Sequence, residues 1–539
     1  MEETVIISPK FQSLDQAETF KNEINGIIQG LSVEEISHNE ILPQLIDQIE
    51  PIDFESQAFP EKSDMKKQIE TLELKIKEAE KNKTSEKETK RYQSLIKNIM
   101  NEMAKLKLTL KHYLILSIEN ILVIAQRNEW DLCKNLDFIY VYNGAYWDSI
   151  NGDTFAKFLG IASEKMGVPI FSARYFKFRD DLQKQFHSSA VLPTPTTDPE
   201  RVLINLRNGT FEISAKGTIL RPFNASDFIT YRLPFDYNPD SVAPIFMAYL
   251  NRVLPDKQSQ TVLAEYMASI FIKHGSKILK EEKALILYGS GANGKSVFYE
   301  VCNALLGQEN TSSYSLEELT DKSGYYRAMI ANKLVNYASE INGKLQADTF
   351  KRMVSGEVIP ARLPYGKPMQ LRQYAKLIFN CNELPKDVEH TNAYFRRFLI
   401  IPFEVTIPEE EQDKTLHVKI IENELSGVFN WVLDGLYGLL DQKHFSECEA
   451  ARNAVEQYKL DSNSIQMFLD EKQYSKSATK YERIKDLYPD YRLFCIEDGM
   501  KPFNKANFAK QLNLLGFLVG REGGTGQKIV YLAKEPESF

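Results

Sequence analysis

The sequence predicts an α/β protein organised around a short buried strand, a glycine-rich loop and a helix. Residues 284–287 are four consecutive apolar residues, as in a strand that is buried within a sheet. The residues from Ser296 onward have the pattern of a helix. The loop between them reads Gly-Ser-Gly-Ala-Asn-Gly-Lys-Ser from Gly289, a complete G-x-x-x-x-G-K-S motif in the strand–loop–helix setting that it requires.

The residue types of this loop suit the binding of a nucleoside triphosphate. Glycines let successive backbone N–H groups turn toward phosphate oxygens, and the helix N-terminus adds the positive end of its dipole. Lys295 can reach the β- and γ-phosphates, and the Ser296 hydroxyl can hold Mg²⁺. The alternative is a glycine-rich turn with a chance Lys-Ser pair. We therefore expect ATP and Mg²⁺ at Gly289, Ser290, Gly291, Ala292, Asn293, Gly294, Lys295, Ser296 and Val297.

Length and composition describe a globular protein of several domains. The 539 residues are too many for one hydrophobic core, and about three to four domains are expected. Hydrophobic residues make up 43% of the chain and charged residues 26%, which are ordinary globular values. The net charge of −8 argues against a surface covered with DNA-binding residues, but it leaves room for a local basic channel.

Cysteine use and apolar runs bear on the compartment. No apolar run reaches the roughly 20 residues of a membrane-spanning helix. The N-terminus lacks a basic start followed by an apolar core, so no signal peptide is expected. These features predict a cytoplasmic protein without a membrane partner. The five cysteines are scattered and lack metal-ligand spacing, so we expect reduced thiols at Cys133, Cys302, Cys381, Cys448 and Cys495.

The N-terminal region is predicted to be helical. Residues 1–60 are acidic and interrupted by prolines, and they indicate no function. A helical hairpin is expected over about 63–112, with a polar turn in which Ser85 and Glu88 form a capping box. Such a hairpin is either a structural arm or an oligomerisation arm. Its two apolar stripes are Met65, Ile69, Leu72, Ile76 and Ala79, and Tyr92, Ile96, Ile99, Met103, Leu106 and Leu110.

A small α+β region is predicted next, followed by helices that precede the strand at 284–287. Aromatic-rich runs on both sides of Asn143-Gly144 predict a β-hairpin. A helix is expected over about 154–166, and a second small sheet over 202–213. Residues 1–280 contain no paired Asp-x-Asp on a strand, as the two-metal site of a primase or polymerase would need.

Three further signals follow the loop in order. A strand-like run ends at Glu340, an acid that could orient the attacking water or Mg²⁺; Ser339 beside it supplies no second carboxylate. A second apolar run ends at Asn382, whose amide could hydrogen-bond to the γ-phosphate or the lytic water. Arg396 and Arg397 precede a third apolar run, and arginine suits the stabilisation of a transferring phosphate in trans. Each signal alone is also common at strand ends, turns and surfaces, so their order after the loop is what favours an ATPase.

Together these segments resemble the superfamily 3 helicases, specifically the helicase-primase branch of phages and plasmids. The matching stretches are GSGANGKS, NYASE, FKRMVSGEVIPARLPYGKP, KLIFNCNELP and FRRFLIIPF. The resemblance covers roughly residues 137–539, and residues 1–136 have no recognised counterpart. The family's fused primase domain is missing from this sequence, so a separate primase is an expected partner.

The resemblance implies an AAA+-type ATPase that forms a hexameric ring around DNA, with ATP sites at subunit interfaces. By position, the resemblance implies that Lys295 and Ser296 bind the nucleotide and Mg²⁺. It implies that Glu340 is the Walker B acid and a metal contact and that Asn382 is the sensor. Arg397, in preference to Arg396, would be the finger into the neighbour's site, and Lys351 a second basic group at that interface.

Residues 351–376 are the first candidate for DNA contact. They contain six basic residues and one acid, a net charge of +5, and the stretch 361–368 resembles the family's pore β-hairpin. A lysine and an aromatic ring at such a tip would grip phosphate and stack on sugar or base without reading the sequence. A solvated turn is the alternative. The expected contacts are Arg362, Tyr365 and Lys367.

The C-terminal segment is expected to form a winged-helix-like DNA-binding domain. Helices over about 465–470, 481–497 and 504–515 precede a β-ribbon with a glycine-rich tip. Residues 500–539 carry six basic residues against three acids, a net charge of +3. A small helical packing domain is the alternative. The candidate DNA contacts are Lys505 and Lys510 on the last helix and Arg521 and Lys528 on the wing.

The chain as a whole is therefore predicted to be an ATP-dependent replicative DNA helicase of a phage or mobile element. It would act in the bacterial host cytoplasm as a homo-hexamer, with single-stranded DNA in the pore and duplex at the winged helix. Alternatives are a small-molecule P-loop kinase and an origin-binding initiator or loader whose ATPase controls assembly. The expected domains are a helical region (1–136), a small α+β region (137–235), a helical collar or oligomerisation segment (236–280), the superfamily 3 AAA+ domain (281–458) and the winged-helix-like domain (459–539).

Overall fold

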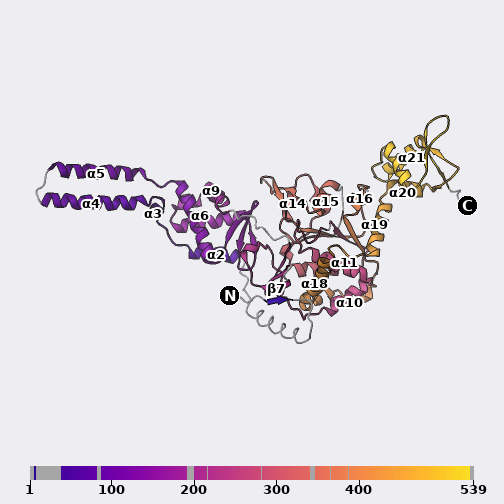
Figure 1. Cartoon of the computed structure of the whole chain (residues 1–539), viewed down its shortest axis with the longest axis horizontal. Coiled ribbons are helices and arrows are strands. Elements are labelled where there is room, and N and C mark those ends of the chain that lie inside the picture. Colours follow the sequence, from indigo (N-terminus) through magenta and orange to yellow (C-terminus); the bar gives the residue numbers. More distant parts are fainter. Residues whose placement is uncertain are drawn as a thin grey trace. The chain divides into compact units, whose positions relative to one another are not determined.

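The chain is a mixture of helices and several β-sheets (Figure 1). It divides into two compact units. The arm unit comprises residues 29–197 and 222–231, and the sheet unit comprises residues 1–28, 198–221 and 232–539. The structure, a computed structural model, describes residues 5–7, 38–81, 86–190, 200–214, 217–280, 282–339, 341, 346–364, 366–385 and 388–534.

The arm unit is mostly helical and has one hydrophobic core. Ile118 and Ile121 of helix α6 are buried in the same cluster as Ile139 and Val141 of strand β3. The domain boundary expected after residue 136 therefore falls inside a shared core. The helices are α2 (His38–Gln48), α3 (Phe54–Ala58), α4 (Glu61–Lys81), α5 (Glu86–Lys105), α6 (Leu110–Arg127), α7 (Gly152–Met166), α8 (Ile170–Arg174) and α9 (Phe176–Ser189).

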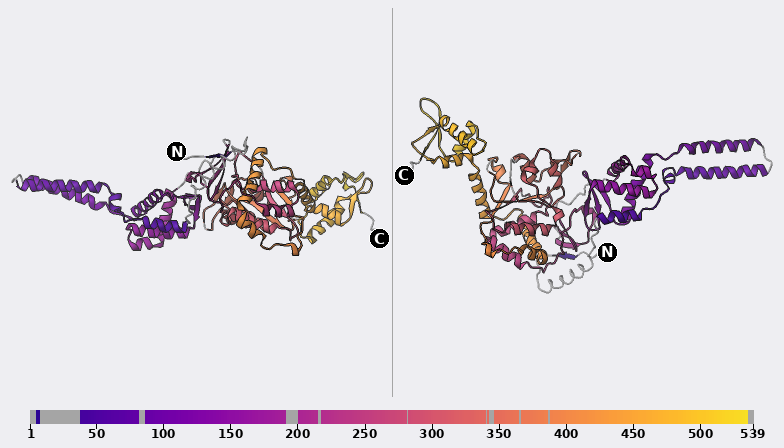
Figure 2. Two further views of the ribbon diagram at one scale, coloured as in Figure 1. Left: turned by 90° about the horizontal axis from the view of Figure 1, so that it is seen from below. Right: turned by 180° about the vertical axis from the view of Figure 1, so that it is seen from behind.

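Helices α4 and α5 form a hairpin and run side by side, as Figure 1 and the right view of Figure 2 show. The expectation that the second helix continues to about residue 112 is wrong, because α5 ends at Lys105 and Leu110 begins α6. The break has a local cause: the backbone N–H of Thr109 donates to Nδ1 of His112 at 3.1 Å, which caps the start of a new helix. Ser85 of the expected capping box lies outside the described residues.

A three-stranded antiparallel sheet in the order β2-β3-β4 completes the arm unit. The predicted hairpin is present, because Tyr142 pairs with Trp147 across a turn that begins at Asn143. Oδ1 of Asn143 accepts hydrogen bonds from the backbone N–H groups of Ala145 and Tyr146 at 3.0 and 2.9 Å. The bounds are β2 (Leu132–Asn135), which was not predicted, β3 (Phe138–Tyr142), β4 (Trp147–Ile150) and the 3₁₀ turn η1 (Ala225–Asp227).

The sheet unit contains a four-stranded antiparallel sheet in the order β1-β7-β6-β5. The segments predicted as a small sheet are its hairpin β5–β6. Gly209 opens β6 with φ of +137°, and a Cβ there would lie 2.6 Å from the carbonyl oxygen of Arg221, so only glycine fits this turn. The bounds are β1 (Val5–Ile7), β5 (Val202–Leu206), β6 (Gly209–Ser214) and β7 (Gly217–Arg221).

The centre of the sheet unit is a five-stranded parallel sheet in the order β14-β8-β13-β10-β9. Its strands are nearly continuous apolar runs and are buried over most of their length, as in parallel sheets with helices on both faces. The bounds are β8 (Ala284–Tyr288), β9 (Thr311–Ser312), β10 (Val335–Ala338), β13 (Lys376–Cys381) and β14 (Phe398–Pro402).

Helices α11 and α18 pack closely against each other in this unit. Near their crossing the buried carboxylate of Glu265 accepts hydrogen bonds from the Ser446 backbone N–H and the Gln442 side chain, both at 2.7 Å. The helices expected up to about residue 280 end earlier, at Ser269. The bounds are α10 (Pro244–Val253), α11 (Lys257–Ser269), α12 (Lys295–Leu306), η2 (Gln308–Asn310), α13 (Leu316–Thr320), α14 (Tyr325–Met329), α15 (Ala347–Val354), α16 (Asn392–Phe395), η3 (Glu409–Glu411), α17 (Leu416–Asn423), α18 (Leu425–Gln442) and α19 (Glu449–Asp461).

The C-terminal domain, residues 464–534, packs three helices and two small sheets around its own core. The helix expected from residue 481 begins at Ile484, because Glu482 and Arg483 form a short strand. The sheets have the orders β16-β18-β17 and β15-β19. The bounds are α20 (Ser464–Glu471), α21 (Ile484–Glu497), α22 (Lys505–Leu514), β15 (Tyr474–Lys476), β16 (Glu482–Arg483), β17 (Val519–Arg521), β18 (Lys528–Val530) and β19 (Leu532–Lys534).

Within the described ranges no single helix is long and apolar enough to cross a membrane. Helices α5 and α6 pass such a test only as a pair, and they are bent by 73° at the break between them.

The crossing of α11 and α18 yields a stability prediction with an internal control. A Cβ at Gly435 would lie 2.5 Å from the Ala264 carbonyl carbon, whereas a Cβ at Gly438 would meet only Glu265 Oε1 at 3.8 Å. Gly435→Ala should therefore destabilise the sheet unit by about 1–3 kcal/mol, because helix backbone must move apart. Gly438→Ala should be neutral or stabilising by up to about 1 kcal/mol, because alanine is the better helix former.

Thermal unfolding followed by circular dichroism measures both changes. A Gly435→Ala variant that melts with or above the wild type would show that the crossing tolerates a methyl group.

Candidate nucleotide-binding site

The loop 289–294 lies at the carboxyl end of β8, between two parallel neighbours. Strand β13 pairs with one side of β8 and strand β14 with the other. The strand that follows β8 in the chain, β9, is at the far edge of the sheet, so the strand order reverses at β8. Ligands of open parallel sheets bind at the carboxyl ends of the strands at such a point.

Three glycines shape this loop. A Cβ at Gly289 would lie 2.4 Å from the Phe403 carbonyl oxygen, and one at Gly294 would lie 2.7 Å from Cγ1 of Val253. Gly291 has φ of +109°, and a Cβ there would meet nothing within 4 Å. Close packing therefore requires glycine at the two ends of the loop. In the middle, at Gly291, the positive φ favours glycine and no neighbouring atom crowds the backbone.

The ammonium group of Lys295 lies inside the loop. Its Nζ donates to the carbonyl oxygen of Gly289 at 2.6 Å, to Oδ1 of Asn293 at 3.1 Å and to Oδ1 of Asn382 at 3.2 Å. Lys295 is 6% exposed, and burial lowers the pKa of its ammonium below the ordinary value. All three acceptors are neutral, and among the described residues no carboxylate pairs with this ammonium, so a bound anion would supply a counter-charge.

The strand register explains why Asn382 reaches Lys295. Cys381, the last residue of β13, pairs with Tyr288, the last residue of β8. The residues that follow each strand therefore emerge side by side. The structure thus brings together two residues that the sequence predicted as functional, although 87 positions separate them.

Ser296 and Glu340 were the predicted metal contacts. Ser296 is exposed in the first turn of α12, whose N-terminus has no side-chain cap. Glu340 lies outside the described residues, two positions after the end of β10. No group of three or more acidic, His or Cys side chains in the described part of the chain could hold a metal by itself. A hydroxyl at a phosphate-binding loop still fits Mg²⁺, which commonly takes few protein ligands alongside phosphate oxygens and water.

Arg396 and Arg397 lie at the opposite edge of the sheet from the loop. Phe398, the next residue, pairs with Ala284 at the amino end of β8. The five residues of β8 lie between this edge and the loop, a distance of about 17 Å at ~3.3 Å per residue. Neither arginine is therefore placed to reach the loop of its own chain.

The two arginines differ in exposure and in bonding. The Arg397 side chain is 9% exposed, lies 3.3 Å from a carboxylate oxygen of Glu282, and donates to Oγ of Ser355 at 2.8 Å. It also donates to backbone carbonyl oxygens of α15 and α16. The Arg396 side chain is 65% exposed and lies 3.9 Å from Glu282. The polar contacts of the Arg397 side chain are thus made within its own chain, whereas the Arg396 side chain is accessible to solvent.

Lys351 of α15 is also held by its own chain. Its Nζ lies 2.8 Å from Oε2 of Glu389 and 2.9 Å from Oδ1 of Asp348. The hydrogen bond to Glu389 is the main cause of a raised pKa for Lys351. The cation expected at an interface is therefore already paired with two carboxylates.

The expected β-hairpin is present as β11 (Ile359–Ala361) and β12 (Met369–Leu371), with residues 362–368 between them. The Arg362 guanidinium lies 4.9 Å from the ring centroid of Tyr325 and donates to its hydroxyl at 2.8 Å. Lys367 is exposed, and Tyr365 lies outside the described residues. Two of the three expected DNA contacts therefore occupy one exposed loop.

The four C-terminal candidates separate into two groups. Lys505 is the first residue of α22 and Lys528 is the first residue of β18, and both line one pocket. Lys510 and Arg521 are exposed elsewhere on the domain.

Sequence reasoning missed the residues that hold the predicted ones in place. The hydroxyl of Tyr249 donates to the carbonyl oxygen of Gly294 at 2.8 Å, and Glu282 contacts both arginines. No motif marks these residues, and their partners are distant in the chain. Lys485 of the pocket was also missed, although a lysine in the first turn of a helix opposes the helix dipole and is a visible local anomaly.

Comparisons with known proteins give two partial family matches. Residues 287–397, which include the whole loop and extend to Arg397, match a family described as being of unknown function. Residues 107–255 match a family described as D5 N terminal like. Each match spans less than half of the chain.

Two viral proteins that are provisionally named helicases are similar to part of the chain. One, from Acanthamoeba polyphaga mimivirus, is 27% identical over 223 residues, which are 38% of this chain and 22% of that protein. The other, from Invertebrate iridescent virus 3, is 23% identical over 244 residues, which are 40% of this chain and 25% of that protein. The matched stretch is thus about a quarter of the length of these relatives.

Among solved structures, the C-terminal region of NrS-1 in its apo form overlaps 76% of this chain and 98% of its own length, at 14% identity and a TM-score of 0.43. The resemblance to proteins that carry helicase names rests on the two viral relatives alone, at low identity and over part of this chain.

The contrast between the two arginines predicts different effects on stability. Arg397→Ala should destabilise the sheet unit by about 1–3 kcal/mol, because it leaves the carbonyl acceptors and Glu282 without their buried donor. Arg396→Ala should change stability by less than about 1 kcal/mol, as for an exposed side chain with one long ion pair.

Thermal or urea unfolding of both variants measures these changes. If Arg396→Ala proves the more destabilising substitution, the assignment of the structural role to Arg397 is wrong.

Proposed function

We propose that the chain is an ATP-dependent DNA helicase of a virus, phage or other mobile element. The placement of Lys295 beside Asn382 carries this proposal, because a buried cation whose three hydrogen-bond acceptors are all neutral lies 3.2 Å from an amide that follows the neighbouring strand. This pair is suited to holding a terminal phosphate and sensing its state. The resemblance to superfamily 3 helicases and the helicase names of the viral relatives support the same function.

We assign ATP as the substrate and Mg²⁺ as the metal. Lys295 and the loop N–H groups would bind the phosphates, and the Ser296 hydroxyl would hold the metal. When bound, Mg²⁺ neutralises charge on the phosphate oxygens during transfer. Asn382 would hydrogen-bond to the terminal phosphate or the attacking water, and Glu340 would orient that water as the Walker B acid.

We propose that the active form is a ring, a hexamer by family resemblance, in which Arg396 completes the site of a neighbouring subunit. The two arginines lie at the sheet edge opposite the loop, so a contribution to catalysis has to be made to another chain. The sequence favours Arg397 for this role, but its side chain is buried in bonds to its own chain. Exposure therefore favours Arg396.

We further assign DNA contacts to two places. The exposed loop between β11 and β12 belongs to a segment with a net charge of +5, which suits attraction to a phosphate backbone in a ring pore. The C-terminal domain, with α22 next to the ribbon of β17 and β18, has the elements of a winged helix that would dock on DNA. A separate primase would be a functional partner.

Loss of the Lys295 charge should abolish the activity. Lys295→Ala should reduce ATP hydrolysis and strand displacement on forked DNA to background, because the loop loses its phosphate-binding cation. Lys414→Ala is the matched control, since Lys414 is exposed and distant in sequence from the loop.

Hydrolysis and strand displacement are measured on the same preparations, with circular dichroism to verify folding. Wild-type hydrolysis in Lys295→Ala would exclude this loop as the ATP site. Hydrolysis stimulated by DNA but without strand displacement in the wild type would favour an initiator or loader instead.

The assignment of Arg396 can be tested by mixing defective subunits. An Arg396→Ala subunit keeps Lys295 and Asn382, whereas a Lys295→Ala subunit keeps the arginine. Each alone should hydrolyse ATP poorly, because a finger contributes on the order of 10³–10⁵ in rate in phosphoryl-transfer systems.

Mixing the two variants should restore part of the activity, because some interfaces then pair an intact loop with an intact arginine. The same experiment with Arg397→Ala is the control that separates the two arginines. Mixed assemblies that form but stay inactive would remove Arg396 from the catalytic site.

A further inference from the structure

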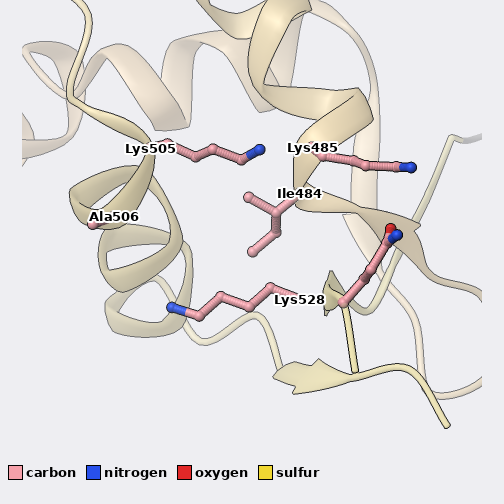
Figure 3. Close-up of a pocket in the computed structure, with 6 residues that line it drawn as sticks. Ile484, Lys485, Lys505, Ala506 and Lys528 are labelled. Atoms are coloured by element: carbon pink, nitrogen blue, oxygen red, sulfur yellow. The ribbon is translucent and has the colours of Figure 1, made fainter. Parts of the chain in front are cut away.

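A pocket of about 440 Å³ lies in the C-terminal domain, and two of the lysines that the sequence marked as DNA contacts, Lys505 and Lys528, line it. Its volume is within the range of about 300–1,000 Å³ that is usual for ligand sites. It is bordered by the first turns of α21 and α22 and by the start of β18 (Figure 3). The lining residues are Ile484, Lys485, Lys505, Ala506, Gln527 and Lys528.

The lining is strongly cationic. Three of its six residues are lysines, and none is an acid. In the described part of the chain no ion pair joins these lysines to a carboxylate, whereas the nearby Arg483 is neutralised by Glu522 at 2.9 Å. The exposed Asp486 in the first turn of α21 is the nearest acid in sequence and does not line the pocket. The pocket therefore carries uncompensated positive charge.

Both helices place lysine where a helix disfavours it. Lys485 is the second residue of α21, and Lys505 is the first residue of α22. The positive end of the helix dipole repels a cation at this position. Helix α22 has no acid in its first turn, and the N-cap residue of α21, Arg483, makes no capping hydrogen bond. An anion between the two N-termini would relieve this repulsion and occupy free N–H groups.

The remaining lining residues indicate that the ligand is more than a simple anion. Ile484 is buried and lies between the side chains of Lys505 and Lys528 (Figure 3). Oε1 of Gln527 is shielded from solvent and has no hydrogen-bond partner among the described residues. A ligand with a phosphate and an apolar surface would match the lysines and Ile484.

We propose that this pocket binds one nucleotide unit of a DNA strand, with its phosphate among the three lysines and its sugar or base over Ile484. The choice of a DNA strand rests on the proposed helicase function, while the phosphate chemistry rests on the pocket itself. A free nucleotide shares that chemistry. The site is separate from Lys510 and Arg521, so it defines which face of the C-terminal domain meets the strand.

The test uses the full chain with two lysines neutralised. Lys485→Gln combined with Lys528→Gln removes pocket charge, and Lys480→Gln combined with Lys501→Gln is the control with the same change of charge on exposed residues of the domain outside the pocket. Binding of a fluorescein-labelled single-stranded oligonucleotide without ATP is followed by anisotropy over a salt series. The pocket variant should lose about 0.7 from the log–log salt slope for each phosphate contact removed, and the control should keep the wild-type slope.

Two outcomes overturn the proposal: equal losses in both variants, which indicate a diffuse basic surface, and no loss in either variant. A calorimetric titration with deoxyadenosine monophosphate separates the two sources of phosphate. If the wild type releases heat on binding the monophosphate and the pocket variant does not, while the salt slope for DNA is unchanged, the ligand of the pocket is a free nucleotide and not a DNA strand.

Thermal melting verifies that the variants fold. ATP hydrolysis without DNA should stay at the wild-type level in the control variant, because its substitutions lie far in sequence from the loop at residue 289. A wild-type chain without any hydrolysis would contradict the proposed function, and the comparison of salt slopes would still decide the role of the pocket.

Discussion

The parallel pairing of β8 with β13 and β14 is the constraint on which the candidate site depends. Because the three strands end at one edge, their following residues converge, and Lys295 meets Asn382 there. Because they also begin at one edge, the arginines before β14 are held about a strand length away. One set of strand pairings thus brings two candidate site residues together and keeps the two candidate arginines out of reach of the same loop.

The amino edge of the sheet also shows how two adjacent residues of one type can have different tasks. Arg397 ties α15, α16 and Glu282 together from a buried position, while Arg396 projects from the same turn. The buried residue fixes the backbone from which the exposed residue extends. A rigid base of this kind favours a precise contact with a partner, because less conformational freedom is lost on binding.

Much of the sheet unit could be predicted from the sequence because local patterns and the motif agreed. The strand before the loop and the run ending at Asn382 are local apolar runs, whereas the β11–β12 hairpin was expected from the family resemblance. The sequence could not predict which of Arg396 and Arg397 is exposed. The Arg397 side chain is held in its buried position by Glu282 and Ser355, which are distant in the chain. The break at Thr109 was missed because the apolar stripe continues through it, and only the His112 side chain marks the new start. Lys485 was missed because the other two lysines of the pocket come from α22 and β18.

The hydrogen bonds of Lys295 bear on the affinity of the loop for a phosphate. The ammonium already donates hydrogen bonds to three neutral oxygen atoms of the protein. Binding of the proposed phosphate would therefore be an exchange, in which phosphate oxygens replace amide and carbonyl oxygens around one nitrogen. The affinity for the phosphate would then reflect only the difference in free energy between the two sets of contacts. A highly charged ligand could therefore bind and still be released after each reaction.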